Sequence, residues 1–90
     1  MAVLTTDEAE QLGRTLAGNI EGLRQALQTM LSTGDRLASP GVWEGQAANQ
    51  FQQEWQDTRR WGQTSVERLT ELQDTVARVN QNITEAGGGR

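Results

Sequence analysis

Two pairs of carboxylates are the residues of this chain whose spacing could support acid–base or metal chemistry. Glu54 with Asp57, and Glu71 with Asp74, would each lie one turn apart on a helix. A di-iron carboxylate site also needs Glu-x-x-His motifs, and zinc sites use histidine or cysteine, but the sequence contains neither residue type. Arginines stand close to both pairs, so solvated ion pairs are the ordinary interpretation. We therefore expect no metal site and no cofactor.

The side chains that most often act as general bases or activated nucleophiles are missing. The sequence has no His, Cys, Lys or Tyr, which leaves carboxylates, hydroxyls and arginines. A serine hydroxyl without a base to remove its proton is a poor nucleophile. The composition therefore argues against an enzyme, and no catalytic residue is predicted.

One short segment, Arg59-Arg60-Trp61, could in principle stack on a nucleic acid. Glu54 and Asp57 lie within about two helical turns of it, however, and the net charge of the whole chain is -4. Arginine stems laid beside a tryptophan, with the charged groups in water, explain the same residues. No nucleic-acid partner is expected.

Two long helices must position these residues, because apolar side chains recur at steps of three and four in two separate segments. The first helix is predicted over about residues 6–37, beginning at a capping box formed by Thr5 and Glu8. Pro40 and its neighbours interrupt the pattern and predict a turn over about 38–45. The second helix is predicted over about 46–85, and the glycines that follow predict a flexible tail over 86–90. The chain is thus read as all-α, a single helical hairpin domain over residues 1–90.

The short connection predicts that the two helices pack antiparallel. If the chain reverses at Val42, helix geometry sets Leu12 against Leu72, Leu16 against Leu69, Met30 against Trp55, and Gly22 against Gly62.

A hairpin of this composition is short of apolar residues for a core of its own, since only 34% of its residues are hydrophobic. We therefore expect two hairpins to pair into a four-helix bundle. Leu31 and Ala26 widen the apolar stripe on the first helix, and Trp61 and Val66 widen it on the second, so a partner is expected to pack there. The residues predicted to form the hairpin or dimer interface are Leu16, Ile20, Leu23, Leu27, Met30, Phe51, Trp55, Trp61, Leu69, Leu72 and Val76.

The segment Gly41-Val42-Trp43-Glu44-Gly45 lies between the two predicted helices. A tryptophan at a helix reversal can cover the open end of the seam, and a glycine two residues later permits a tight turn. This W-x-G tripeptide, centred in a chain of 90 residues, resembles the W-x-G hundred-residue family of the early secreted antigenic target type. Trp43 and Gly45 correspond to the family motif, although Trp43 as a purely structural cap is the alternative interpretation.

The resemblance implies a dimeric four-helix bundle that is exported folded by a type VII secretion machine with an FtsK-like ATPase. It also implies a composite export signal, in which the W-x-G turn of one subunit lies beside a Tyr-x-x-x-Asp/Glu motif on the other. This chain contains no tyrosine. The resemblance therefore favours a heterodimer with a paralogous hairpin protein that supplies the tail motif, with a homodimer as the other possibility.

The sequence is compatible with several hypotheses about where in or outside the cell the protein acts. It shows no signal-peptide layout at residues 1–5 and no apolar run of the ~20 residues that a membrane span needs. We expect a cytoplasmic protein that is secreted without a signal peptide. A helical-hairpin adaptor that is never exported is the first alternative. A membrane-active effector ranks last, because neither helix has a basic amphipathic face.

Overall fold

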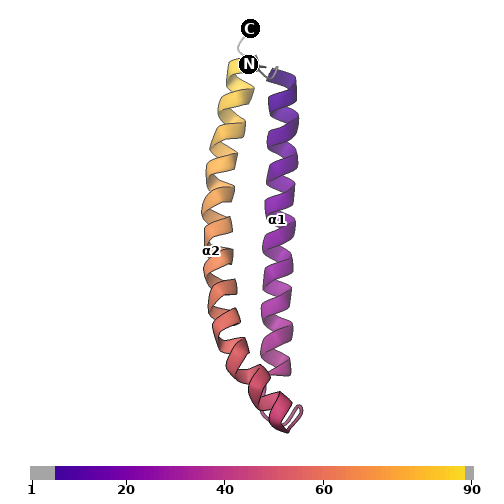
Figure 1. Cartoon of the computed structure of the whole chain (residues 1–90). Helices are drawn as coiled ribbons and strands as arrows, with labels where there is room; N and C mark the ends of the chain where they lie inside the picture. Colours follow the sequence, from indigo (N-terminus) through magenta and orange to yellow (C-terminus); the bar gives the residue numbers. More distant parts are fainter. Residues whose placement is uncertain (1–5, 89–90) are drawn as a thin grey trace, which may run out of the picture.

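The computed structural model describes residues 6–88, which form two long α-helices joined by a turn. Helix α1 spans Thr6–Leu37 and helix α2 spans Gln46–Gly88. The two helices run antiparallel and side by side along most of their length (Figure 1). The described residues contain no strand, and the all-α hairpin predicted from the sequence is confirmed.

Helix α1 has the charge pattern of a stable helix at both ends. Asp7 and Glu8 stand in its first turn and Arg36 in its last, where each complements the helix dipole. Thr5, the predicted cap, lies outside the described residues. At the other end, the amide of Ala38 donates to the carbonyl of Gly34 (2.8 Å), and the Ser39 hydroxyl donates to the carbonyl of Asp35 (2.9 Å). These bonds satisfy carbonyls that the end of a helix leaves without a partner.

Helix α2 continues to Gly88, three residues past the predicted end at residue 85. The glycines at its end each cost about 1 kcal/mol relative to alanine, and this cost does not stop the helix before Gly88. The first residues of the predicted tail therefore belong to the helix, and the last two, 89–90, lie outside the residues that the structure describes.

The core is one narrow seam between the helices. Its buried apolar residues are Ile20 and Leu27 on α1 and Ala48, Trp55 and Val76 on α2. The backbone spans 66 Å by 24 Å by 15 Å, so the fold is a rod one layer of helices thick. Each helix consequently has one helical neighbour, and both broad faces of the rod meet solvent. None of the described helices is long and apolar enough to cross a membrane.

The register of the hairpin differs from the one predicted. Trp55 packs on Gly34 rather than Met30, and Gly62 faces Leu31 rather than Gly22, which has open space around it. Asn80 packs on Gly13 and donates to its carbonyl (3.0 Å). These partners place the centre of the reversal near Gln46 instead of Val42.

The reason for this shift lies in the turn itself. The first turns of α2 extend past the end of α1 (Figure 1) and pack on the connecting segment. Gln52 donates to the carbonyl of Ala38 (3.1 Å), and Trp43 contacts Phe51. Leu69 accordingly lines a hollow with Leu23, so its predicted pairing with Leu16 is wrong, and the same shift rules out the pairing of Leu12 with Leu72.

Candidate functional site

The W-x-G turn is built on two glycines with left-handed backbone conformations. Gly41 has φ of 85° and Gly45 has φ of 112°, values that side chains with a Cβ rarely adopt. Gly45 stands immediately before α2, and its carbonyl accepts the amide of Asn49 (3.1 Å). The glycine of the tripeptide thus has a backbone role, because it lets the chain turn directly into the second helix.

Trp43 caps the end of α1. Its indole Nε1–H donates to the carbonyl of Leu37 (3.1 Å), one of the last carbonyls of that helix. Its ring lies 6.3 Å from the ring of Phe51, tilted by 54°. The side chain is half-buried, so one part packs on the hairpin while another part meets solvent. This geometry is compatible with both interpretations of Trp43, as a structural cap and as a recognition residue.

The aromatic cluster continues from the turn into the seam. Phe51 stacks on Trp55 with ring centroids 5.9 Å apart, and Trp55 is buried. The indole of Trp55 lies on the backbone of Gly34, where a Cβ would overlap the ring. Sequence reasoning identified Trp55 and Phe51 but missed Gly34, since a glycine in a helix carries no sign of the ring that covers it.

Asp35 of α1 makes polar contacts that connect this aromatic cluster to α2. Its Oδ1 accepts the Nε1–H of Trp55 (2.8 Å) and the Nε–H of Arg59 (2.9 Å). The hydrogen bond from Trp55, and secondarily the bond and charge of Arg59, hold the pKa of the Asp35 carboxyl below its usual value. Two residues of α2 are thereby tied to one carboxylate of α1.

A second polar link lies farther from the turn. Glu21 of α1 accepts hydrogen bonds from Gln73 of α2 and from Arg24 on its own helix. The bond from Gln73, followed by that from Arg24, lowers the pKa of Glu21. On the same side of the seam, a shallow hollow is lined by Gln28, Leu31, Gln63, Val66 and Glu67. This broad side of the rod, which we call the polar face, is therefore rich in amides and charges.

The opposite side of the rod carries the exposed large apolar residues. On α1 the exposed residues recur at one step of four and then at steps of seven residues, and on α2 they recur at steps of eleven and seven residues. All of these steps keep the side chains on one side of a helix. On α1, Gln28 of the polar face lies about 140° around the helix from Leu23. On α2, Gln63 of the polar face lies about 160° around the helix from Trp61. We call this surface the apolar face, and its exposed members are Leu12, Leu16, Leu23, Met30, Leu37, Trp61, Leu72 and Val79.

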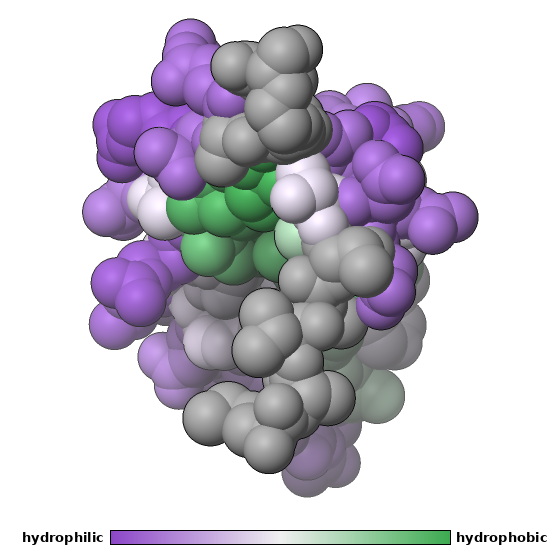
Figure 2. Space-filling view, turned by 90° about the horizontal axis from the view of Figure 1, so that it is seen from above, coloured by the Kyte–Doolittle hydropathy of each residue, from purple (hydrophilic) through white to green (hydrophobic). Residues whose placement is uncertain are grey.

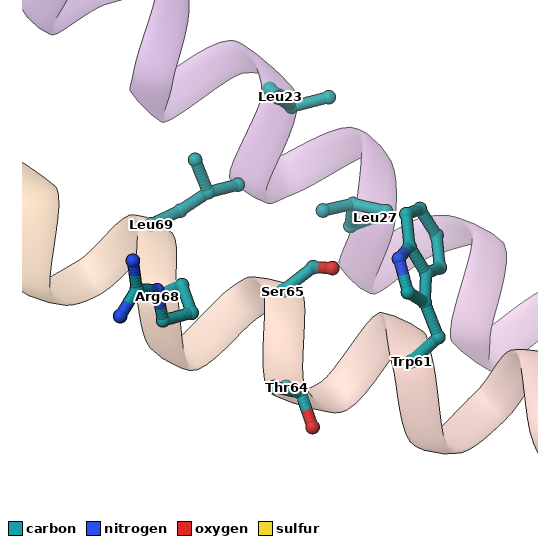
Figure 3. A pocket seen from close by; sticks show the side chains of 7 residues that line it. All are labelled: Leu23, Leu27, Trp61, Thr64, Ser65, Arg68 and Leu69. Atoms are coloured by element: carbon teal, nitrogen blue, oxygen red, sulfur yellow. The ribbon is translucent and has the colours of Figure 1, made fainter.

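A hollow of about 390 Å³ interrupts the apolar face at mid-length. Leu23 and Leu27 come from α1, and Trp61, Ser65 and Leu69 face them from α2, with Thr64 and Arg68 at the rim (Figure 3). Seen along the rod, hydrophobic residues lie between hydrophilic residues on two sides (Figure 2). The exposed fraction of Trp61 is 59%, so this large side chain projects from the face beside the hollow.

The predicted interface residues divide into three groups by their burial. Ile20, Leu27, Trp55 and Val76 are buried within the hairpin. Phe51 and Leu69 are half-buried. Leu16, Leu23, Met30, Trp61 and Leu72 lie on the apolar face and are exposed in the single chain. Leu31 and Val66 line the polar-face hollow and so do not share a surface with Trp61.

Of the two carboxylate pairs considered in the sequence analysis, Asp57 makes an ordinary ion pair. Asp57 pairs with Arg60 (3.5 Å), and both side chains are highly exposed. Arg59 is engaged by Asp35 (2.9 Å), so both arginines of the Arg59-Arg60-Trp61 segment face carboxylates. Among the described residues there is no group of three or more potential metal ligands.

Two antiparallel helices closed by a glycine turn, with a tryptophan capping the first helix, define the class of small helical-hairpin proteins. A family model described as "Proteins of 100 residues with WXG" matches residues 4–87, and the chain belongs to this family. The family comprises small helical secreted proteins and is associated with type VII secretion substrates. Searches of curated proteins and of solved structures returned no match.

Proposed function

We propose that this chain is a type VII secretion substrate that works as one half of a four-helix dimer. The observation that carries the proposal is the one-sided distribution of apolar residues on the rod. Eight large apolar side chains are exposed on one face, while the opposite face is held by polar links. Exposed apolar surface of this extent marks an interaction site, and a second hairpin laid on this face would complete a bundle.

The partner in this proposal is a paralogous helical hairpin that supplies the C-terminal export motif. The absence of tyrosine from these 90 residues supports this assignment, because they contain no Tyr-x-x-x-Asp/Glu motif. The FtsK-like secretion ATPase then acts on the dimer, with the Trp43 turn contributed by this subunit. The Trp43 side chain is only partly buried in the hairpin, as a recognition role requires.

Export is tested by expressing the chain with the protein encoded beside it, in cells with an intact or an inactivated secretion ATPase. We expect the chain in the culture supernatant only when both the ATPase and the partner are functional. Trp43→Ala should reduce export while circular dichroism shows that the helices remain. Glu44→Ala, at an exposed position of the same turn, is the matched control and should be exported normally.

A helical-hairpin adaptor that is never exported would use the same apolar face. This alternative predicts a stable complex inside the cell. It also predicts that the amount of the chain in the culture supernatant is the same with an intact and with an inactivated ATPase. Normal secretion of Trp43→Ala would instead leave Trp43 with a structural role alone.

A further inference from the structure

Three aromatic rings, which we call the aromatic row, connect the W-x-G turn to the interior of the hairpin. The ring of Trp43 lies 6.3 Å from that of Phe51, with the two planes tilted by 54°. Phe51 lies 5.9 Å from Trp55, with the planes nearly parallel at 13°. Trp43 and Phe51 are partly buried, whereas Trp55 is only 8% exposed. The row therefore joins a ring that meets solvent to a ring that is fixed in the seam.

Both ends of the aromatic row are bonded to the last turn of α1. The indole Nε1–H of Trp43 donates to the carbonyl of Leu37 (3.1 Å), and that of Trp55 donates to Oδ1 of Asp35 (2.8 Å). Leu37 and Asp35 are two residues apart, so a tryptophan of the turn and a tryptophan of α2 are attached to one helical turn. Phe51 lies in contact with both rings. The contacts thus form a closed loop that begins and ends on α1.

The inner end of the row is held on two sides. The ring of Trp55 lies on the backbone of Gly34, where even a Cβ would overlap it. Asp35, which accepts the Trp55 hydrogen bond, also accepts one from the Nε–H of Arg59 (2.9 Å). Movement of Trp55 would therefore break a hydrogen bond or lose a close contact, and its position is determined by α1.

The orientation of Trp43 depends on this inner end. A hydrogen bond fixes the place of its indole nitrogen, but the ring can still rotate about the N–H···O direction. A second contact on the ring is needed to determine the orientation, and Phe51 supplies it. Phe51 is itself oriented by stacking on the buried Trp55, and aromatic pairs favour such stacked and tilted geometries. Asp35 can thus influence Trp43 through two intervening rings.

We propose that Phe51 is a positioning residue of the W-x-G turn, and that Asp35 acts on the same turn indirectly by holding Trp55. The aromatic row keeps the Trp43 indole in the orientation in which its accessible part is recognised. A side chain held in its bound orientation loses less conformational freedom on binding, which favours recognition. The inference deepens the proposed function and rests on it, because the row matters for export only if Trp43 is recognised.

Coupling along the row is tested by fluorine NMR of the full chain labelled with fluorotryptophan. The three tryptophans give three signals, which single Trp→Phe variants assign. Asp35→Ala removes the acceptor of the Trp55 hydrogen bond and leaves Phe51 and the carbonyl of Leu37 in place. It should nevertheless shift or broaden the signal of Trp43. The signal of Trp61, which projects from the apolar face, should stay unchanged and serves as the internal reference.

Two further variants separate the row from its surroundings. Phe51→Leu keeps an apolar side chain but removes the ring, and it should move the Trp43 signal, whereas Phe51→Tyr keeps the ring and should leave that signal near its wild-type position. Arg59→Gln removes the ion pair with Asp35 but retains the Trp55 hydrogen bond, so it should move the Trp43 signal much less than Asp35→Ala does.

The role in recognition is tested by the export of variants that retain Trp43, each checked for helicity by circular dichroism. If the ring were correctly oriented in only about a tenth of the molecules, the apparent affinity would fall about tenfold, and Phe51→Leu should lose export to a similar extent. Phe51→Tyr should be exported like the wild type. Asp35→Ala repeats the test without a change in the row itself. Ile20→Val weakens the buried seam elsewhere, so it controls for general loss of stability and should be exported normally.

The outcomes distinguish this inference from the proposed function. A Trp43 signal that moves in neither Asp35→Ala nor Phe51→Leu would overturn the coupling. Normal export of Phe51→Leu, in an assay where Trp43→Ala is not exported, would overturn the positioning role and leave the proposed function standing. Normal export of Trp43→Ala as well would overturn the recognition of Trp43, which is a failure of the proposed function whatever the NMR signals show.

Discussion

Single residues decide how closely the helices of this hairpin approach each other. Gly34, Gly13 and Gly62 each lie under a side chain of the opposite helix, whereas Gly18 and Gly22 have open space where a Cβ would be. The sequence presents all five as glycines within predicted helices and gives no sign of this difference. The register of the seam determines which glycines contact a side chain of the opposite helix. A glycine without such a contact only lowers the stability of its own helix.

Alanine substitutions at Gly34 and Gly18 should therefore have opposite effects. Gly34→Ala would place a methyl group in the buried indole of Trp55 and is expected to cost about 1–3 kcal/mol. Gly18→Ala meets no neighbour and should stabilise the hairpin by about 0.5–1 kcal/mol through helix propensity. Urea unfolding followed by circular dichroism measures both variants, and equal effects would contradict the placement of Trp55.

The carboxyl of Asp35 should make the stability of the turn end dependent on pH. Its pKa is lowered in the folded chain, chiefly by the hydrogen bond from Trp55 and then by Arg59. A carboxyl with a lowered folded pKa stabilises the fold above its unfolded value, and this contribution disappears as the pH falls through the folded pKa. Stability should accordingly decrease as the pH falls from about 5 toward 2.

Asp35→Asn is the variant that isolates this effect. It retains the shape of the side chain but cannot titrate, so its melting temperature should fall less steeply over the same acidic range. Glu21, whose pKa is lowered by Gln73 and Arg24, contributes in the same direction and remains in the variant as an internal reference. An unchanged acidic slope in Asp35→Asn would rule out the contribution of Asp35.

At the scale of the elements, the sequence predicted the first helix and the turn almost to the residue. The apolar stripes, the acids of the first turn and Pro40 define those bounds through local physics alone. The register could not be read in the same way, because it depends on the extension of α2 past the end of α1. That extension arises from the packing of Phe51 and Gln52 on the connecting segment, which is not local to either helix.

The same limit applies to the site. Trp43 and Gly45 could be selected from the sequence, because a tripeptide between two periodic segments is a local signal. The division of the apolar residues into a buried seam and an exposed face could not, since Ile20 and Leu23 belong to one continuous stripe. Their exposed fractions, 4% and 53%, follow only from where α2 lies.

The turn itself should be sensitive to loss of its second glycine. Gly45→Ala forces a residue with a Cβ to adopt φ near 112°, which is expected to destabilise the hairpin by about 1–3 kcal/mol. Glu44→Ala, at the neighbouring exposed position, should have little effect. Thermal unfolding of the two variants provides the comparison, and a neutral Gly45→Ala would show that the turn does not need a left-handed residue there.

For the whole molecule, folding and pairing depend on different residues, because the buried seam holds the hairpin together and the apolar face is available to a partner. Ile20→Asp puts a charge into the buried seam and should unfold the hairpin, at a cost of several kcal/mol. Leu23→Asp puts the same charge on the apolar face, so the single chain should keep its helices while losing its partner. Thr29→Asp, at an exposed position of α1 outside that face, should do neither.

Circular dichroism and light scattering on the three variants distinguish these outcomes. The sequence alone would place Ile20 and Leu23 in one interface and predict that both substitutions unfold the chain. Complete loss of helicity in Leu23→Asp would mean that the hairpin cannot fold without its partner, so that the two processes are coupled.

The elongation of the rod has a practical consequence for how this protein migrates. Its radius of gyration is 19.6 Å, whereas a compact domain of this length has a radius of about 12 Å. A molecule of this shape experiences greater friction than a sphere of equal mass, so it elutes early from a gel-filtration column calibrated with globular standards. A single hairpin would then carry the apparent mass of a dimer, and an antiparallel pair of rods, thicker but hardly longer, would elute only slightly ahead of it.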